Sequence, residues 1–142
     1  MDLSEILTIS GKPGLYKIVA QSPGRVIVES ILDGKRMPIF MRHNFSILSD
    51  ISIYTMEDDI PLGEVFKSLY ELEGGAASID HKADEKELEA KMTEVVPDYD
   101  RDEVRHADMR KLIKWYNLLI AHKLWTPADL EEEEEKNTDE EE

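Results

Sequence analysis

The sequence changes character near residue 56. Residues 1–56 contain short runs rich in β-branched and aromatic residues, separated by glycine and proline, which is typical of strands joined by tight turns. Beyond that point apolar residues recur at helical spacing. The chain therefore divides into a strand-rich part, residues 1–56, and a helical part, residues 57–126. Because parts this small bury only about 60% of their unfolded surface, we expect them to pack on each other, or the chain to form a homodimer.

Five short strands are predicted in the first part. Turn signals such as Pro23-Gly24 and Asp33-Gly34 join them, and a helical turn over residues 44–48 precedes the last one. This layout predicts an α+β protein that begins with a small five-stranded SH3-like or Tudor-like barrel, because closing the sheet protects its edges. An open meander covered on one face by the later helices is the alternative. The predicted strands span residues 3–9, 15–21, 25–31, 36–41 and 51–54, and Pro38 favours an edge position for the fourth.

A three-helix domain is predicted in the second part. Acidic residues and Pro61 favour a helix start near residue 58, and Gly74-Gly75 ends that helix. Residues 74–83 have the composition of a flexible linker. Asp84 is a candidate N-cap for the second helix, which Pro97 ends. The third helix is expected from about residue 107 to residue 123.

The third predicted helix is apolar on two sides. One broad stripe contains Met109, Leu112 and Tyr116, whereas Trp115 falls largely on another side. A helix that is apolar on two sides is buried on two sides. It is therefore either the central spine of the helical domain, or it presents the Trp115 face to a partner, since large exposed apolar patches mark interfaces.

The net charge of −15 is unevenly distributed. Residues 1–56 carry six basic and five acidic side chains, whereas residues 57–130 carry ten and eighteen, and residues 131–142 carry one and nine. Like charges without apolar residues predict disorder, so residues 127–142 are expected to form a disordered acidic tail. A phosphate backbone is attracted by clustered cations, so nucleic acid is expected to contact residues 1–56 only.

No residue pattern predicts catalysis, a cofactor or a metal. The chain has no cysteine, and its four histidines lack metal-ligand spacing. Asp98, Asp100 and Asp102 resemble the start of a calcium loop, but Glu103 stands where the turn glycine is needed and Met109 where the bidentate glutamate is needed. We therefore expect no enzyme, no cofactor and no metal site. The first residues lack the basic patch and apolar run of a signal peptide, and no apolar run reaches membrane-spanning length, so we expect a cytoplasmic location without membrane contact.

The candidate binding surface lies mainly on the predicted barrel. Small barrels bind peptides or nucleic acids in grooves lined by aromatic residues, and this part of the chain interleaves aromatic and basic residues. The competing interpretation is that the aromatic residues are core and the cations are ordinary surface. The candidate partner surface comprises Tyr16, Arg25, Arg36, Arg42, Phe45 and Tyr54, together with Trp115 on the third helix.

Three segments carry a family resemblance: LSEILxISGKPGLY at residues 3–16, PDYDRD at residues 97–102 and KWYNLL at residues 114–119. In these motifs the chain resembles an uncharacterised family of small bacterial proteins, known only as domains of unknown function. The resemblance covers roughly residues 1–125 and implies the two-part layout, but no activity, ligand or catalytic residue.

The sequence thus predicts a non-enzymatic cytoplasmic adaptor that binds a protein partner through the barrel groove or an exposed helical face. The alternative is an RNA-binding or nucleic-acid-associated regulatory protein that uses the basic and aromatic barrel surface. Salt-dependent retention on RNA separates the two.

Overall fold

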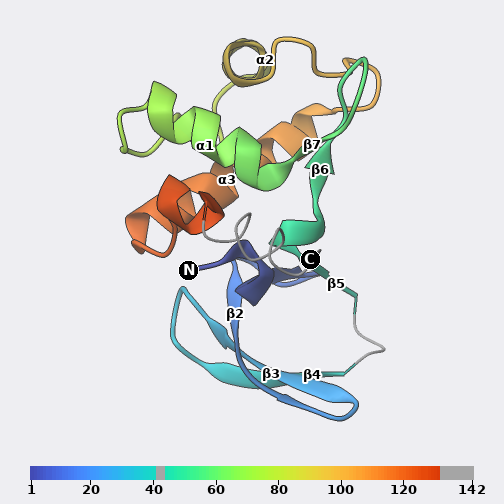
Figure 1. Cartoon of the computed structure of the whole chain (residues 1–142), viewed down its shortest axis with the longest axis vertical. Coiled ribbons are helices and arrows are strands. Elements are labelled where there is room, and N and C mark those ends of the chain that lie inside the picture. The colour runs from blue at the N-terminus through green and yellow to red at the C-terminus, as the bar shows by residue number, and fades with distance from the viewer. Residues whose placement is uncertain (41–43, 132–142) are drawn as a thin grey trace.

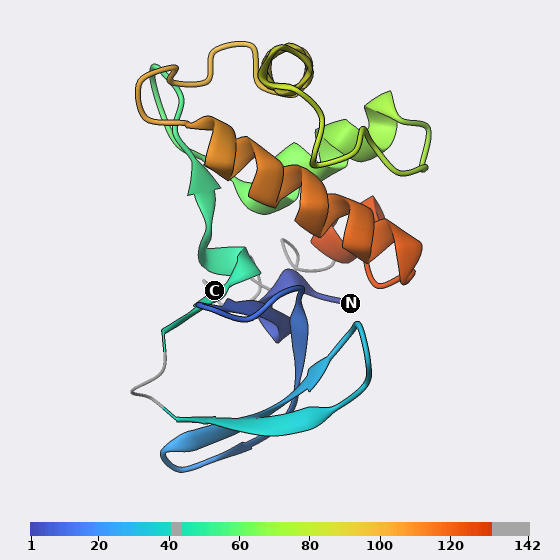
Figure 2. The same cartoon turned by 180° about the vertical axis from the view of Figure 1, so that it is seen from behind.

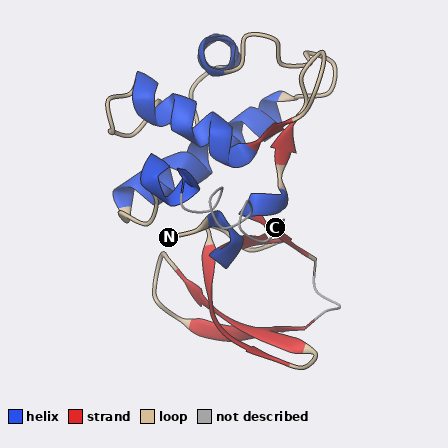
Figure 3. Ribbon diagram, viewed as in Figure 1, coloured by secondary structure: helices blue, strands red, loops and turns tan. Residues whose placement is uncertain are grey.

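The computed structural model describes residues 1–40 and 44–131. Strands dominate one end of the molecule and helices the other, and the first residues of the chain lie between them (Figures 1 and 3). The protein is therefore a mixed α+β structure with an antiparallel sheet and several helices, as the sequence predicts.

A five-stranded antiparallel sheet forms the strand-rich end, in the order β4-β3-β2-β1-β5. Ser22 pairs with Arg25, so Pro23-Gly24 is a two-residue hairpin loop, and Gly24 has the positive φ of +80° that favours glycine. Pro38 lies on the edge strand, where its missing N–H is tolerated. The strands are β1 (Ile6–Ile9), β2 (Tyr16–Ser22), β3 (Arg25–Ser30), β4 (Arg36–Phe40) and β5 (Phe45–Ile47).

The sheet is open, so the predicted closed barrel is not confirmed. Strand β1 has two neighbours, β2 and β5, whereas β4 pairs only with β3 among the residues that the structure describes. Strand β5 contributes three residue pairs to β1, from Leu7↔Ile47 to Ile9↔Phe45, and then the chain leaves the sheet. The open sheet beneath helices is closer to the alternative drawn from the sequence.

Three local predictions in this region are wrong. Residues 45–47, expected within a helical turn, form β5, and the 3-10 turn η2 follows at Leu48–Asp50. Residues 51–54, expected as the last strand of the sheet, instead contain β6 (Ser52–Ile53), which pairs with β7 (Ile60–Pro61) beside the helices. The first predicted strand also begins later than expected, because Leu3–Glu5 form the 3-10 turn η1.

The helices α1 (Leu62–Leu72), α2 (Glu85–Val95) and α3 (His106–Ala121) lie close to their predicted positions. The start predicted near residue 58 is wrong, because Ile60–Pro61 pair with β6 as strand β7 and α1 begins only at Leu62. The Asp84 carboxylate caps α2 by accepting a hydrogen bond from the Glu87 N–H at 2.9 Å. Among the described residues, no helix is long and apolar enough to cross a membrane.

The segment between α1 and α2, predicted to be a flexible linker, is hydrogen-bonded to α3. The Asn117 side chain accepts from Ser78 N–H at 2.7 Å and donates to the Ile79 carbonyl at 2.9 Å. The Tyr116 hydroxyl donates to the Ala76 carbonyl at 2.8 Å, and the Arg110 guanidinium donates to two further carbonyls at 2.9 Å. These bonds supply the backbone partners that a helix or strand would otherwise provide.

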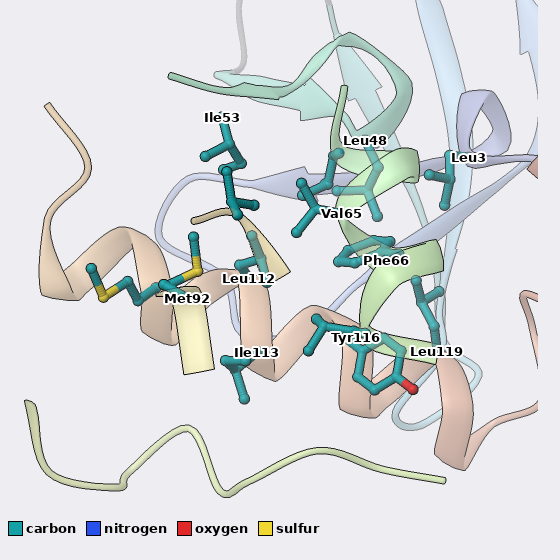
Figure 4. Close-up of a cluster of buried hydrophobic side chains, with 14 of the residues drawn as sticks. Leu3, Leu48, Ile53, Val65, Phe66, Met92, Leu112, Ile113, Tyr116 and Leu119 are labelled. Carbon is teal, nitrogen blue, oxygen red and sulfur yellow. The ribbon is translucent and has the colours of Figure 1, made fainter. Parts of the chain in front are cut away.

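One hydrophobic core joins the strand-rich and helical parts (Figure 4). Leu3, Ile6 and Leu48 from the first part are at most 1% exposed, and they pack in one cluster with side chains of α1, α2 and α3. Trp125 is also 1% exposed, and its ring lies edge-on to the Phe66 ring, with 5.8 Å between the two ring centres. A smaller cluster of Leu7, Ile9, Tyr16, Val28 and Ile39 lies within the sheet.

The helical part extends beyond its predicted end at residue 126. Residues 127–131 are helical, and Leu130 is only 7% exposed because it packs near Gly63 and Leu3. The disordered acidic tail predicted for residues 127–142 is therefore wrong for residues 127–131, and the rest of that prediction, residues 132–142, lies outside the described residues.

Candidate functional site

The sheet offers fewer exposed aromatic rings than the sequence suggests. Tyr16 is 7% exposed and belongs to the small sheet core, and Phe45 is half-buried against the same cluster. These two rings contribute to packing, which was the competing interpretation. Tyr16 therefore presents no free face on which a base or an aromatic side chain can stack, and packing covers part of Phe45.

The predicted cations of the sheet differ in their surroundings. Arg25 is exposed at the start of β3, whereas the Arg36 Nε donates to Glu29 Oε1 at 3.2 Å. Lys17 Nζ lies 3.0 Å from the other oxygen of the same carboxylate. The hydrogen bonds from Lys17 and Arg36 hold the pKa of Glu29 below its usual range. Arg42 lies outside the described residues.

Two other predicted residues, Tyr54 and Trp115, line one small apolar hollow of about 140 Å³. Tyr54 is 52% exposed at the end of the β6 segment, and the hydrogen bond from Asp100 N–H to its carbonyl, 2.9 Å long, holds the backbone there. Trp115 is half-buried on α3. The apolar hollow is lined by Ile51, Ser52, Ile53, Tyr54, Leu62, Val104, Asp108, Lys111, Leu112 and Trp115.

A second, larger hollow of about 430 Å³ shares the Trp115 ring. Its lining contains three lysines and, among the described residues, no carboxylate. We call it the lysine hollow, and we call the two hollows together the Trp115 surface. The lysine hollow is lined by Thr8, Ile9, Ser10, Gly11, Lys12, Pro13, Gly14, Ser46, Ile51, Lys111, Lys114 and Trp115.

Helical periodicity and sheet register build the lysine hollow. Lys111, Lys114 and Trp115 stand at i, i+3 and i+4 on α3, so they share one helix face. Opposite them, Thr8 of β1 is paired with Ser46 of β5, on the side of these strands that faces away from the small sheet core. Figure 2 shows α3 above these N-terminal segments.

The β1–β2 loop completes the lysine hollow and brings Lys12 to it. Gly14 has a φ of +79°, and a Cβ there would lie 2.6 Å from Leu32 Cδ1, so this position requires glycine. The loop lacks the spacing of a phosphate-binding loop. It nevertheless places one lysine opposite the two on α3.

The three lysines were not among the residues predicted from the sequence. Lys111 and Lys114 share their helix face with Trp115, and this i, i+3, i+4 spacing is a signal that the sequence contains. Nothing in the sequence relates them to Lys12, which is about a hundred residues away along the chain. Only the packing of α3 beside the β1–β2 loop brings the three together.

A third hollow, of about 490 Å³, lies where α2 meets the start of α3. His106 Nε2 is 2.7 Å from Glu89 Oε1, and the Arg101 guanidinium lies 4.2 Å from the centre of the Tyr99 ring. These groups pair with one another and connect the two helices. Within residues 1–40 and 44–131, no cluster of histidine and carboxylate side chains is arranged to hold a metal ion.

A similar solved structure decides the family of this protein. It is the solution NMR structure of a protein from Bacteroides vulgatus, a target of the Northeast Structural Genomics Consortium. The two are 40% identical, with a TM-score of 0.71, over 87% of this chain and 89% of that one. The chain belongs to this uncharacterised bacterial family. The family resemblance predicted from the sequence is therefore confirmed.

Two family models match consecutive segments of this family member. One, a domain of unknown function (DUF5606), matches residues 3–48, and the other, a domain of unknown function (DUF6852), matches residues 51–119. Among curated proteins, none matches the chain. Lys12 falls in the first matched segment, and Lys111, Lys114 and Trp115 fall in the second, so the lysine hollow lies at their junction.

Proposed function

We propose that this protein is a non-enzymatic binding module that holds a protein partner on the Trp115 surface. The observation that carries the proposal is the position of Trp115, whose half-buried ring forms a wall of both hollows. Aromatic side chains beside well-packed hollows supply much of the binding energy in protein interfaces. Tyr54, 52% exposed, and Met56, 70% exposed, add apolar surface close by.

The lining of the lysine hollow supports a binding role over a catalytic one. Ser10 and Ser46 lie in its lining, but among the described residues no histidine, carboxylate or lysine side chain is hydrogen-bonded to either hydroxyl as a general base would be. Lysine ammonium groups at a surface attract a ligand by charge. The alternative function, RNA binding through the sheet, has less support, because Tyr16 is buried and Arg36 is engaged by Glu29.

We also infer that the sheet has the strand layout of an SH3-like barrel and that the protein acts in the cytoplasm. The strand order β4-β3-β2-β1-β5 supports the first inference, because it places the last strand beside the first, as closure requires. Nuclear Overhauser contacts between β4 and β5 would support closure in solution. Cell fractionation with an antibody to the protein tests the location.

The binding proposal is tested by affinity capture with matched variants of the full chain. Wild type, Trp115→Ala and Leu72→Ala are immobilised and exposed to native lysate with and without nuclease. Leu72 is a suitable control because it is 45% exposed and does not line either hollow. We expect a protein that wild type and Leu72→Ala retain and Trp115→Ala loses, with or without nuclease.

A second variant guards against misfolding, because Trp115 also packs against the main core. Tyr54→Ala removes an exposed ring from the same surface and leaves that core intact. Equal retention by all four proteins would refute the proposal. Retention that nuclease abolishes would favour the RNA-binding alternative.

A further inference from the structure

We propose that the partner segment bound at the Trp115 surface is acidic, with one aliphatic side chain in the apolar hollow and carboxylates against Lys12, Lys111 and Lys114. This inference rests on the proposed function, since both place the partner against Trp115. It adds the chemistry of the partner. That chemistry follows from the charge of the lysine hollow, from the size of the apolar hollow and from the fact that the two hollows are adjacent at Trp115.

The charges of the lysine hollow are available to a ligand. Lys12, Lys111 and Lys114 have no ion-pair partner among residues 1–40 and 44–131. Other lysines are engaged within the protein, as in the pairs Lys91–Glu73 at 2.8 Å and Lys17–Glu29 at 3.0 Å. The lysine hollow is therefore a local cationic patch on a chain whose net charge is −15.

The apolar hollow is sized for one side chain. Its volume of about 140 Å³ is close to that of the ~150 Å³ apolar cavities that admit a benzene-sized group. Ile51, Leu62 and Leu112 supply apolar walls. Asp108, also in the lining, accepts a hydrogen bond from the Arg105 N–H at 3.0 Å, which anchors this carboxylate at the start of α3.

The two hollows are adjacent, so one short segment spans both. Ile51, Lys111 and Trp115 line each of them. A segment with an aliphatic residue in the apolar hollow would place its neighbouring residues over the lysines. Acidic neighbours complement these lysines, whereas basic neighbours would be repelled.

A nucleic acid fits this surface less well than an acidic peptide. Nucleic acids carry charge along their whole length and favour continuous basic surfaces. Here three lysines, of which Lys111 lines both hollows, form one small patch within a chain whose residues 57–130 carry eighteen acidic and ten basic side chains. Arginine, whose planar group stacks on bases and grips phosphate with two donors, is absent from the described lining of both hollows.

The test is a titration of the ¹⁵N-labelled full chain with defined probes, followed by NMR chemical shifts. The first probe is a capped pentapeptide of four glutamates around a central leucine. The second replaces that leucine by serine, the third replaces the glutamates by glutamines, and the fourth is a five-nucleotide oligouridylate. We expect saturable shifts from the first probe at the Lys12, Lys111 and Lys114 amides and at the Trp115 indole.

Each part of the inference has its own expected loss of affinity. The serine probe should bind about tenfold more weakly, because it loses a buried aliphatic side chain. The glutamine probe should bind about three- to tenfold more weakly, as should the leucine probe to a Lys111→Ala/Lys114→Ala variant. A Lys82→Ala/Lys86→Ala variant is the matched control, since both lysines are exposed and line neither hollow.

Three results would overturn the inference. The first is an absence of chemical-shift changes at millimolar concentrations of the leucine probe. The second is that the leucine probe binds the Lys111→Ala/Lys114→Ala variant as tightly as it binds the wild type. The third is that the oligouridylate binds at the same residues more tightly than the leucine probe does. These outcomes are separable from failure of the proposed function. If Trp115→Ala loses a captured protein partner while Lys111→Ala/Lys114→Ala retains it, the binding module stands and the acidic partner does not.

Discussion

Leu130 packs on α1 next to Gly63. Gly63→Ala should therefore destabilise the wild-type protein but stabilise a variant that lacks the Leu130 side chain. A Cβ added at Gly63 would lie 2.7 Å from Leu130 Cδ1 and 3.5 Å from Leu3 Cδ1. Crowding of this kind in a packed core costs about 1–3 kcal/mol, whereas alanine in place of a helical glycine stabilises by up to about 1 kcal/mol. Gly63→Ala alone should therefore lower the free energy of unfolding by about 1 kcal/mol.

Removing the Leu130 side chain should reverse this effect. Leu130→Ala should itself cost about 2 kcal/mol, because the leucine is 7% exposed and leaves a cavity. In that background Gly63→Ala no longer meets Leu130 Cδ1, so it should stabilise by about 0.5–1 kcal/mol. The two substitutions would then be coupled by about 2 kcal/mol.

Urea denaturation of the full chain, followed by tryptophan fluorescence, measures all four proteins of this cycle. The wild type and the Leu130→Ala variant are the two reference states. If Gly63→Ala destabilises both backgrounds equally, Leu130 does not pack where the structure places it. In that case the helical turn at residues 127–131 is not part of the core.

Three further predictions concern the helical part. Burial, with a smaller contribution from the Glu73 charge, raises the pKa of Tyr116 to about 12. The folded state therefore holds this proton more tightly than the unfolded chain, whose tyrosine pKa is about 10, so this contribution is complete below pH 10 and lost between about pH 10 and 12. Between pH 10 and 12, the free energy of unfolding of Tyr116→Phe, measured by urea denaturation, should fall less than that of the wild type. Equal falls in the two proteins would contradict this. Asn117→Ala should speed hydrogen exchange at the Ser78 amide, because it removes the acceptor of that N–H. Unchanged exchange would contradict the hydrogen bonding of residues 74–83 to α3. Asp84→Ala should cost about 1 kcal/mol by removing the α2 cap, whereas Asp84→Asn should retain most of it.

Local patterns predicted the positions of α1, α2 and α3, but not the helical turn at residues 127–131. Leu62, Val65, Phe66 and Leu69 recur at helical spacing, and all four are buried on α1. Asp84 was identified as an N-cap from its own residue type, and its carboxylate accepts the expected hydrogen bond. In each case the signal and the structure involve residues a few positions apart, so sequence alone carries the information.

Features that depend on distant residues were not predicted. Phe45-Ser46-Ile47 becomes a strand because it pairs with β1, about 40 residues earlier, and the short run itself is ambiguous between helix and strand. The 74–83 segment has linker composition, but Asn117 and Tyr116 supply its hydrogen bonds from α3. The lysine hollow requires Lys12 and α3 to meet, and no periodicity encodes that meeting.

The core shared by the two parts has a consequence for how this family is built. The segment matched by the first family model ends at residue 48, and the segment matched by the second begins at residue 51. The core nevertheless crosses this boundary: side chains before it pack with side chains after it, namely Leu3, Ile6 and Leu48 with Phe66 and Leu112. A gene cut at this boundary would yield two fragments, each with a bare apolar face that invites aggregation. The two segments are therefore expected to occur together in one chain. Where a genome encodes one segment without the other, we expect a different protein segment to cover the exposed apolar face.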